Sequence, residues 1–242
     1  MKKNFFLVFA FIGLAGYAQK YTDTDTISVK SNILDEDITV ITYNANISIN
    51  NTPFIYITDG QKMIENGTLS TIKSLGQAGK TKEAMYIFIS TIDQKTQEDR
   101  RDTYFFCNED YVRFFEEELV PRVEGSMNRK IVPAQRSLVG ISFGGLNAAY
   151  FSGKTDLFGN YALLSPITYP CQDFMKGIAF SENKDLRILL TSGTNDAENY
   201  MAPLLNMYKG KGYEVESFTT EGAHDFGNWN GQLERVLTFL LN

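Results

Sequence analysis

The chain has 242 residues, of which 43% are hydrophobic and 21% are charged, as is typical of a soluble protein with one domain of ordinary size. Its formal net charge is −6, so the composition does not favour nucleic acid or an anionic membrane surface, both of which attract clustered Lys and Arg. With one histidine and two cysteines the sequence has no Cys/His cluster of zinc-binding spacing, and we expect neither a metal nor a cofactor.

The first 18 residues have the pattern of a secretory signal peptide. Lys2 and Lys3 give a positively charged start, residues 5–14 are apolar, and residues 16–18 (GYA) supply the small-x-small cleavage pattern. The apolar stretch is too short for a comfortable membrane span. We therefore expect a signal peptide over residues 1–18, a mature domain over residues 19–242 without an integral membrane segment, and a periplasmic or secreted protein.

Short apolar segments alternate with segments of helical spacing along the rest of the chain. The predicted strands are residues 21–32, 38–43, 54–57, 84–90, 137–141, 161–164, 186–191 and 213–218. The predicted helices are residues 68–79, 108–123, 144–152, 197–210 and 229–241, with Asn108 as a candidate N-cap. This alternation predicts an α/β fold, a three-layer sandwich around a mostly parallel central sheet.

Residues 138–146 read LVGISFGGL and match the G-x-S-x-G pattern of a nucleophile elbow around Ser142. A predicted strand precedes the serine and a predicted helix follows it, so a sharp turn between them would lift the hydroxyl clear of the backbone. The glycines would let the strand and the helix approach closely. Because glycine is common, the pattern is weak evidence without this context and without suitable residues downstream.

The carboxyl ends of four predicted strands carry residues that could take part in chemistry, and ligands of parallel sheets bind at that edge. These residues are Asp59-Gly60, Ser142, Asp196 and the segment at residues 219–229, which contains His224, the single histidine of the chain. A lone histidine is more often structural, but the order Ser142, Asp196, His224 is that of the α/β-hydrolase triad. In that triad the imidazole takes the serine proton and the carboxylate orients the imidazole.

Two other acids compete with Asp196 for the third position of the triad. Glu198 is expected to begin a helix and point away, and Asp225 is too close to His224 in sequence to reach its ring in a suitable geometry. We therefore predict that Asp196 is the acid.

The oxyanion hole of such a site uses two backbone N–H groups, one from the residue after the nucleophile and one from the loop after the third strand. These rules predict the N–H groups of Phe143 and Gln61.

Several stretches resemble the putative esterase family of α/β-hydrolases, which includes enterochelin (siderophore) esterases, feruloyl and acetyl xylan esterases, S-formylglutathione hydrolase and bacterial mycolyltransferases. The stretches are FIYITDG, DRRDTYFF, YVRFFEEELVPRVE, RSLVGISFGGLNAAY, LLSP, LLTSGTNDAEN and GYEVESFTTEGAHDFGNW. The resemblance implies the same triad and oxyanion donors on an α/β-hydrolase fold. The chain departs from the family in its short length: no stretch is long enough for a lid domain, so we expect none. The resemblance also implies substrate contacts by Arg101 and Trp229, for which a surface salt bridge and core packing are the respective alternatives.

The predicted function is therefore that of an exported serine esterase acting through an acyl-enzyme on a siderophore-type trilactone or an acylated glycan. One alternative is an acyltransferase with the same triad, which would differ in how it excludes water, and another is a non-catalytic binding protein with a hydrolase fold. The substrate, the oligomeric state and the state of Cys107 and Cys171 stay open. The two cysteines could pair in an oxidising compartment, but the sequence does not fix the distance between them.

Overall fold

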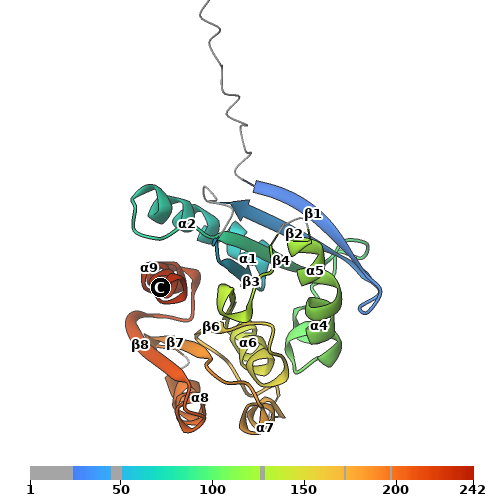
Figure 1. Cartoon of the computed structure of the whole chain (residues 1–242). Coiled ribbons are helices and arrows are strands. Elements are labelled where there is room, and N and C mark those ends of the chain that lie inside the picture. The colour runs from blue at the N-terminus through green and yellow to red at the C-terminus, as the bar shows by residue number, and fades with distance from the viewer. Residues whose placement is uncertain (1–23, 45–50, 126–128, 172, 197) are drawn as a thin grey trace, which may run out of the picture.

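The computed structural model describes residues 24–44, 51–125, 129–171, 173–196 and 198–242, so the predicted signal peptide lies outside the described residues. These residues form an eight-stranded sheet in the order β1-β2-β4-β3-β5-β6-β7-β8, with helices on both faces (Figure 1). β1 (Thr24–Ser31) and β2 (Glu36–Asn44) are antiparallel, as are β2 and β4 (Met85–Asp93). The other neighbouring strands pair in parallel, which confirms the mostly parallel three-layer α/β prediction.

The parallel part of the sheet brings the carboxyl ends of its strands to one edge, where the candidate site lies. Its strands besides β4 are β3 (Phe54–Ile57), β5 (Arg136–Ile141), β6 (Asn160–Leu164), β7 (Arg187–Asn195) and β8 (Glu214–Ala223). Every residue of β3 and β6 is buried, as expected of strands covered on both faces. β7 and β8 run beyond their predicted ends because their pairing continues to Asn195 and Ala223, through residues interpreted from sequence as turns.

Two apolar cores lie on opposite faces of the sheet. One face is covered by α1 (Gly60–Glu65), α2 (Thr68–Gln77) and α9 (Phe226–Leu241). The other is covered by α3 (Arg101–Phe105), α4 (Glu109–Phe114), α5 (Val120–Glu124), α6 (Phe143–Lys154), α7 (Asp173–Phe180) and α8 (Glu198–Gly210) (Figure 1). Within the described parts of the chain, no helix is long and apolar enough to cross a membrane.

The predicted helix at residues 108–123 is interrupted by a π-helical turn at Phe115–Leu119, between α4 and α5. Pro121 lacks the N–H group that a regular α-helix would donate to the carbonyl of Glu117, so the hydrogen-bond register can widen there. At the start of the segment, the Asn108 side chain accepts a hydrogen bond of 3.1 Å from the Tyr111 N–H, as expected of an N-cap.

Cys107 and Cys171 form a disulfide with their Cα atoms 6.2 Å apart, which answers the question that the sequence left open. Cys107 lies between α3 and α4, and Cys171 lies in the segment between β6 and α7. The bond therefore ties the connection after β6 to the junction of two helices on the same face of the sheet.

Candidate active site

Ser142 lies in a sharp turn between β5 and α6, with φ 56° and ψ −118°. A positive φ is unfavourable for a residue with a side chain and is kept where the surrounding structure enforces it. A Cβ atom at Gly140 would lie 2.0 Å from the carbonyl oxygen of Gly144, and one at Gly145 would lie 2.9 Å from the Cα atom of Pro166. Gly140 thus allows β5 to fold directly against α6, in the strand–turn–helix arrangement that the sequence predicts, and Gly145 allows α6 to approach the segment after β6.

His224 follows β8 and bridges Ser142 and Asp196. Its Nε2 atom lies 2.9 Å from the Ser142 Oγ atom, and its Nδ1 atom lies 2.5 Å from the Asp196 Oδ1 atom. The His224 side chain is 36% exposed, whereas that of Asp196 is completely buried. With its proton on Nδ1, the imidazole can accept the serine proton at Nε2 while the carboxylate holds that tautomer. The structure therefore brings together the three residues that the sequence predicts as a triad.

Asp196 has a second set of contacts on its other carboxylate oxygen. The Oδ2 atom accepts hydrogen bonds from the Ser165 hydroxyl and, at 3.2 Å, from the Gly193 N–H. Ser165 in turn accepts the indole N–H of Trp229 at 2.8 Å. Ser165 was not among the residues predicted from the sequence, although its place directly after a strand at the same edge of the sheet was a signal that could have found it.

Trp229 is 5% exposed, and its ring meets the ring of His224 edge to face with centroids 4.9 Å apart. Trp229 therefore packs in the core against the imidazole, in agreement with the core-packing alternative to a substrate contact.

The two competing acids have other positions in the fold. Asp225 is the N-cap of α9 and accepts a hydrogen bond of 2.9 Å from the Asn228 N–H. Glu198 begins α8, as the sequence predicts.

Arg101 binds Asp59, which lies between β3 and α1 and directly precedes α1. Its Nε atom lies 2.8 and 2.9 Å from the two carboxylate oxygens, and its Nη2 atom donates a 3.4 Å hydrogen bond to the carbonyl oxygen of Ile141. The side chains are 16% and 0% exposed, so this ion pair is buried and differs from the surface salt bridge that was the alternative to a substrate contact. Burial raises the pKa of the Asp59 carboxyl, and the guanidinium of Arg101 opposes that rise.

The two predicted oxyanion donors lie in the first turns of helices at the same edge of the sheet. Phe143 is the first residue of α6, and Gln61 is the second residue of α1. The backbone N–H groups of a first turn have no acceptor within their own helix. The side chain of Gln61 is fixed to β4 through Thr91, whose N–H donates to Oε1 at 3.0 Å and whose hydroxyl accepts from Nε2 at 2.8 Å.

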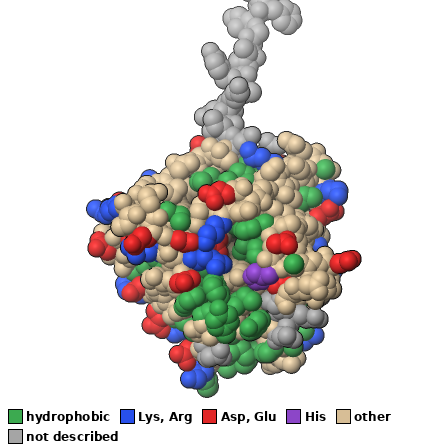
Figure 2. Space-filling view, turned by 180° about the vertical axis from the view of Figure 1, so that it is seen from behind, with side chains coloured by type: hydrophobic (Ala, Val, Ile, Leu, Met, Phe, Trp, Pro, Cys, Tyr) green, Lys and Arg blue, Asp and Glu red, His purple; other side chains and the backbone are tan. Residues whose placement is uncertain are grey.

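An aromatic cluster of Phe106, Phe143 and Tyr169 adjoins the nucleophile. The Phe143 ring meets Phe106 at 5.0 Å and Tyr169 at 6.0 Å between centroids, in both cases edge to face. Tyr169 is 62% exposed. Figure 2 shows the single histidine, in purple, at the margin of an apolar patch on this face of the molecule. The disulfide adjoins the cluster in sequence, because Phe106 precedes Cys107 and Tyr169 lies two residues before Cys171.

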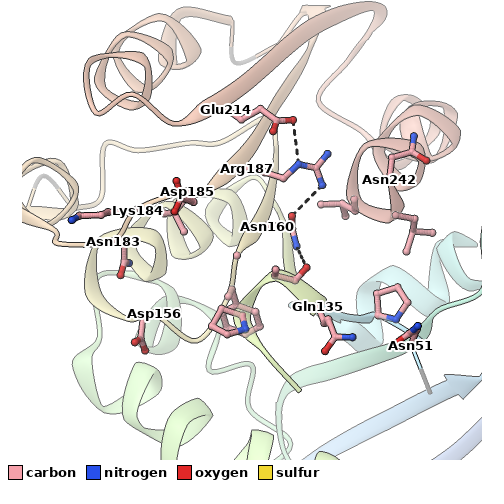
Figure 3. A pocket seen from close by; sticks show the side chains of 18 of the residues that line it. Asn51, Gln135, Asp156, Asn160, Asn183, Lys184, Asp185, Arg187, Glu214 and Asn242 are labelled. Carbon is pink, nitrogen blue, oxygen red and sulfur yellow. Dashed lines mark hydrogen bonds and ion pairs between the residues drawn. The ribbon is translucent and has the colours of Figure 1, made fainter. Parts of the chain in front are cut away.

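A separate hollow of about 1260 Å³ lies at the opposite edge of the sheet, where the parallel strands begin (Figure 3). Arg187, on its wall, donates to Glu214 at 3.1 Å and to the side-chain oxygen of Asn160 at 3.2 Å, and Asn160 donates to the carbonyl of Ala134 at 2.9 Å. These polar groups join strand ends to one another, so we assign this hollow no part in catalysis.

A family model described as "Putative esterase" matches residues 31–240, which is most of the chain. The chain belongs to the putative esterase family. This membership confirms the resemblance seen in the sequence.

The chain spans less than two thirds of the length of the first two relatives described here. A stretch of 135 residues is 25% identical to an endo-1,4-beta-xylanase/feruloyl esterase of Xylanibacter ruminicola, covering 54% of this chain and 18% of that protein. The crystal structure of the enterobactin esterase FES from Shigella flexneri with 2,3-di-hydroxy-N-benzoyl-glycine gives a TM-score of 0.76 at 22% identity, over 91% of this chain and 59% of that one. A ferulic acid esterase gives 0.70 at 16% identity, over 90% and 96% of the two chains. At these identities the two structural likenesses establish the fold.

Proposed function

We propose that this esterase is an exported serine carboxylic-ester hydrolase in which Ser142 is the nucleophile, His224 the general base and acid, and Asp196 the group that orients His224. The observation that carries the proposal is the pair of hydrogen bonds from one imidazole, 2.9 Å to the Ser142 hydroxyl and 2.5 Å to the Asp196 carboxylate. A serine hydroxyl is a poor nucleophile until a base at this distance accepts its proton.

In the first half of the reaction, Ser142 Oγ attacks the carbonyl carbon of the ester while its proton passes to His224 Nε2. The N–H groups of Phe143 and Gln61 would donate hydrogen bonds to the resulting oxyanion, and the loss of one such donor typically costs about 3 kcal/mol of transition-state stabilisation. The intermediate then collapses, the bond to the alcohol oxygen breaks, and His224 returns the proton to that oxygen. The product is an acyl-enzyme on Ser142.

In the second half, water attacks the acyl carbon and gives a proton to His224 Nε2. Collapse of the second intermediate breaks the bond to Ser142 Oγ, which regains a proton from the imidazolium, and the carboxylic acid is released. Buried Asp196 stabilises the imidazolium in both halves, since its side chain has no solvent exposure and lies 2.5 Å from Nδ1.

For the substrate, we propose an ester with an aromatic ring close to the bond that is broken, as in a siderophore-type trilactone or a feruloylated glycan. The aromatic cluster supports this choice, because the half-buried Phe143 follows the nucleophile directly and the exposed Tyr169 packs against it. Two structural neighbours support the same chemistry: the enterobactin esterase was solved with a dihydroxybenzoyl compound, and another neighbour is a ferulic acid esterase.

Export is part of the proposal. It is supported by the signal-peptide pattern of residues 1–18 and by the Cys107–Cys171 disulfide, since disulfides form and persist mainly in oxidising compartments.

The test is the hydrolysis of p-nitrophenyl acetate and butyrate by the purified protein beside Ser142→Ala, followed by a catecholate trilactone and feruloylated arabinoxylan. We expect the variant to lose activity by at least about 10³-fold. Equal background rates for the two proteins on all four substrates would contradict the proposal and favour the non-catalytic binding protein. Preferential transfer of the acyl group to an added alcohol over water would favour the acyltransferase.

A further inference from the structure

We propose that Ser165 is a positioning residue that holds Asp196 in its productive orientation, and that Trp229 fixes the direction in which the Ser165 hydroxyl donates. This role rests on the proposed serine-esterase function. The proposal adds two residues that support the triad, Ser165 and Trp229, and neither would touch the substrate.

The position of Ser165 follows from the order of the strands. β6 lies between β5, which leads to Ser142, and β7, which leads to Asp196, so the residue after β6 lies between the nucleophile and the acid. The side chain of Ser165 is completely buried, and its backbone has φ 48°. Its N–H donates a 2.7 Å hydrogen bond to the carbonyl of Thr191, which continues the pairing of β6 with β7. The backbone is thus fixed in an unfavourable conformation beside Asp196.

The direction of the Ser165 proton follows from the chemistry of its neighbours. The indole N–H of Trp229 can only donate, and it lies 2.8 Å from Ser165 Oγ. An ionised carboxylate can only accept, and Asp196 Oδ2 is the second partner of the same oxygen. The single hydroxyl proton must therefore point at Asp196. Without the indole donor the hydroxyl could turn, because its orientation would no longer be imposed from the other side.

These contacts make a closed circuit of four side chains. His224 bonds to Asp196 Oδ1, Asp196 Oδ2 bonds to Ser165, and Ser165 bonds to Trp229. The rings of Trp229 and His224 then pack edge to face. With Oδ2 held by Ser165 and by the Gly193 N–H, the Oδ1 atom is aimed at the imidazole. Hydrogen bonds to a charged acceptor are stronger than those between neutral groups. Loss of the hydrogen bond from Ser165 would therefore leave the buried carboxylate of Asp196 freer to rotate away from His224.

The test compares Ser165→Ala, Trp229→Phe and the double variant with the wild-type protein. Ser152→Ala is the matched control, since Ser152 is also completely buried and its hydroxyl also bonds to an aromatic partner, the Tyr208 hydroxyl at 2.9 Å. We expect kcat to fall about 10-fold or more in Ser165→Ala with KM little changed, and to stay near wild type in Ser152→Ala. Because Trp229 acts through Ser165, the double variant should be no slower than Ser165→Ala. Additive losses would contradict the proposal.

The second readout is the imidazole NMR signal, which belongs to one residue because the chain has a single histidine. We expect a downfield Nδ1–H resonance in the wild-type protein that moves upfield or broadens in Ser165→Ala and in Trp229→Phe but not in Ser152→Ala. An unchanged resonance in the first two variants would overturn the proposal. If Ser165→Ala does not fold, Trp229→Phe alone decides by the same signal.

This readout does not depend on turnover, so it separates the two proposals. A wild-type protein without ester hydrolysis, but with a resonance that responds to Ser165→Ala, would contradict the esterase mechanism and support the positioning role. If the protein is active but the resonance is unchanged in both Ser165→Ala and Trp229→Phe, the positioning role is contradicted and the esterase mechanism is not.

Discussion

Arg101 holds the buried carboxylate of Asp59 with its Nε atom 2.8 and 2.9 Å from the two oxygens, and it also binds the carbonyl of Ile141. Asp59 precedes α1, which carries Gln61, and Ile141 precedes Ser142. The ion pair therefore joins the two connections from which the proposed oxyanion donors come.

Replacing Arg101 should destabilise the fold. We expect Arg101→Met to lower the free energy of unfolding by about 3–5 kcal/mol at neutral pH, because it leaves Asp59 charged and buried without its counter-ion. Urea unfolding measures this change. Arg113→Met is the control, since Arg113 is 52% exposed in its ion pairs with Asp110 and Glu117, and we expect it to change stability by about 1 kcal/mol or less. Equal effects of the two substitutions would contradict a buried pair.

The loss in Arg101→Met should depend on pH. Burial already raises the pKa of Asp59, and removing the guanidinium should raise it further. A raised pKa means that the folded protein binds the proton more tightly than the unfolded chain does, so stability is gained as the pH falls through the folded-state pKa. The deficit relative to wild type should therefore shrink between neutral pH and about pH 5 or below. A deficit that stays constant over this range would show that Asp59 is not its cause.

The identity of the acid can be tested with two chemically identical substitutions. Asp196→Asn should lower kcat by about 10⁴-fold, because an amide cannot hold the Nδ1–H tautomer or stabilise the imidazolium. Asp225→Asn should leave kcat and stability near wild type, because Asn is a good N-cap and Asp225 caps α9. Steady-state hydrolysis of a p-nitrophenyl ester measures both variants. If Asp225→Asn instead loses most of its kcat while Asp196→Asn stays active, Asp225 and not Asp196 is the acid of the triad.

The aromatic cluster predicts a selective effect on substrates. Tyr169→Ala should raise KM for a feruloyl ester about 5- to 10-fold, as expected for the loss of about 1 kcal/mol of ring contact, and should leave p-nitrophenyl acetate hydrolysis unchanged. Phe180→Ala is the control, because Phe180 is 85% exposed at the last residue of α7. Both variants should unfold within about 0.5 kcal/mol of wild type. An equal change in KM for both esters would argue against an aromatic subsite.

The disulfide should stabilise the fold. Cys107 and Cys171 are 64 residues apart, and closing a loop of that length typically contributes about 2–4 kcal/mol. We expect dithiothreitol to lower the unfolding free energy of the wild-type protein to that of Cys107→Ser/Cys171→Ser, which should itself not respond to the reductant. If reduction leaves the unfolding free energy of the wild-type protein unchanged, the stabilising role of the disulfide is contradicted.

The sequence located Ser142, Asp196 and His224 because each follows a segment with a strand pattern, and parallel strands bring their carboxyl ends to one edge of a sheet. It did not predict the contacts of Arg101 with Asp59 and of Ser165 with Asp196, because each contact joins segments that are distant in sequence and is set by tertiary structure. The disulfide could not be predicted from the sequence either, because the distance between the Cα atoms of two cysteines depends on how distant segments pack.

Three α-helices in the described part of the chain, α1, α3 and α7, were not predicted. Each has at most eight residues, which is too short for a clear helical period, and each owes its stability to buried side chains in the cores. Those buried residues are Met63 in α1, Tyr104 and Phe105 in α3, and Phe174 and Ile178 in α7.

The most direct test of the central claim is to trap the acyl-enzyme. The protein would be mixed with a p-nitrophenyl ester, quenched in acid during the first turnover, and digested for mass spectrometry. We predict a burst of one p-nitrophenol per protein molecule and one added acyl group on the peptide that contains Ser142, with neither seen in Ser142→Ala. An acyl group on another residue, or a Ser142→Ala variant that is acylated and turns over like the wild type, would contradict Ser142 as the nucleophile.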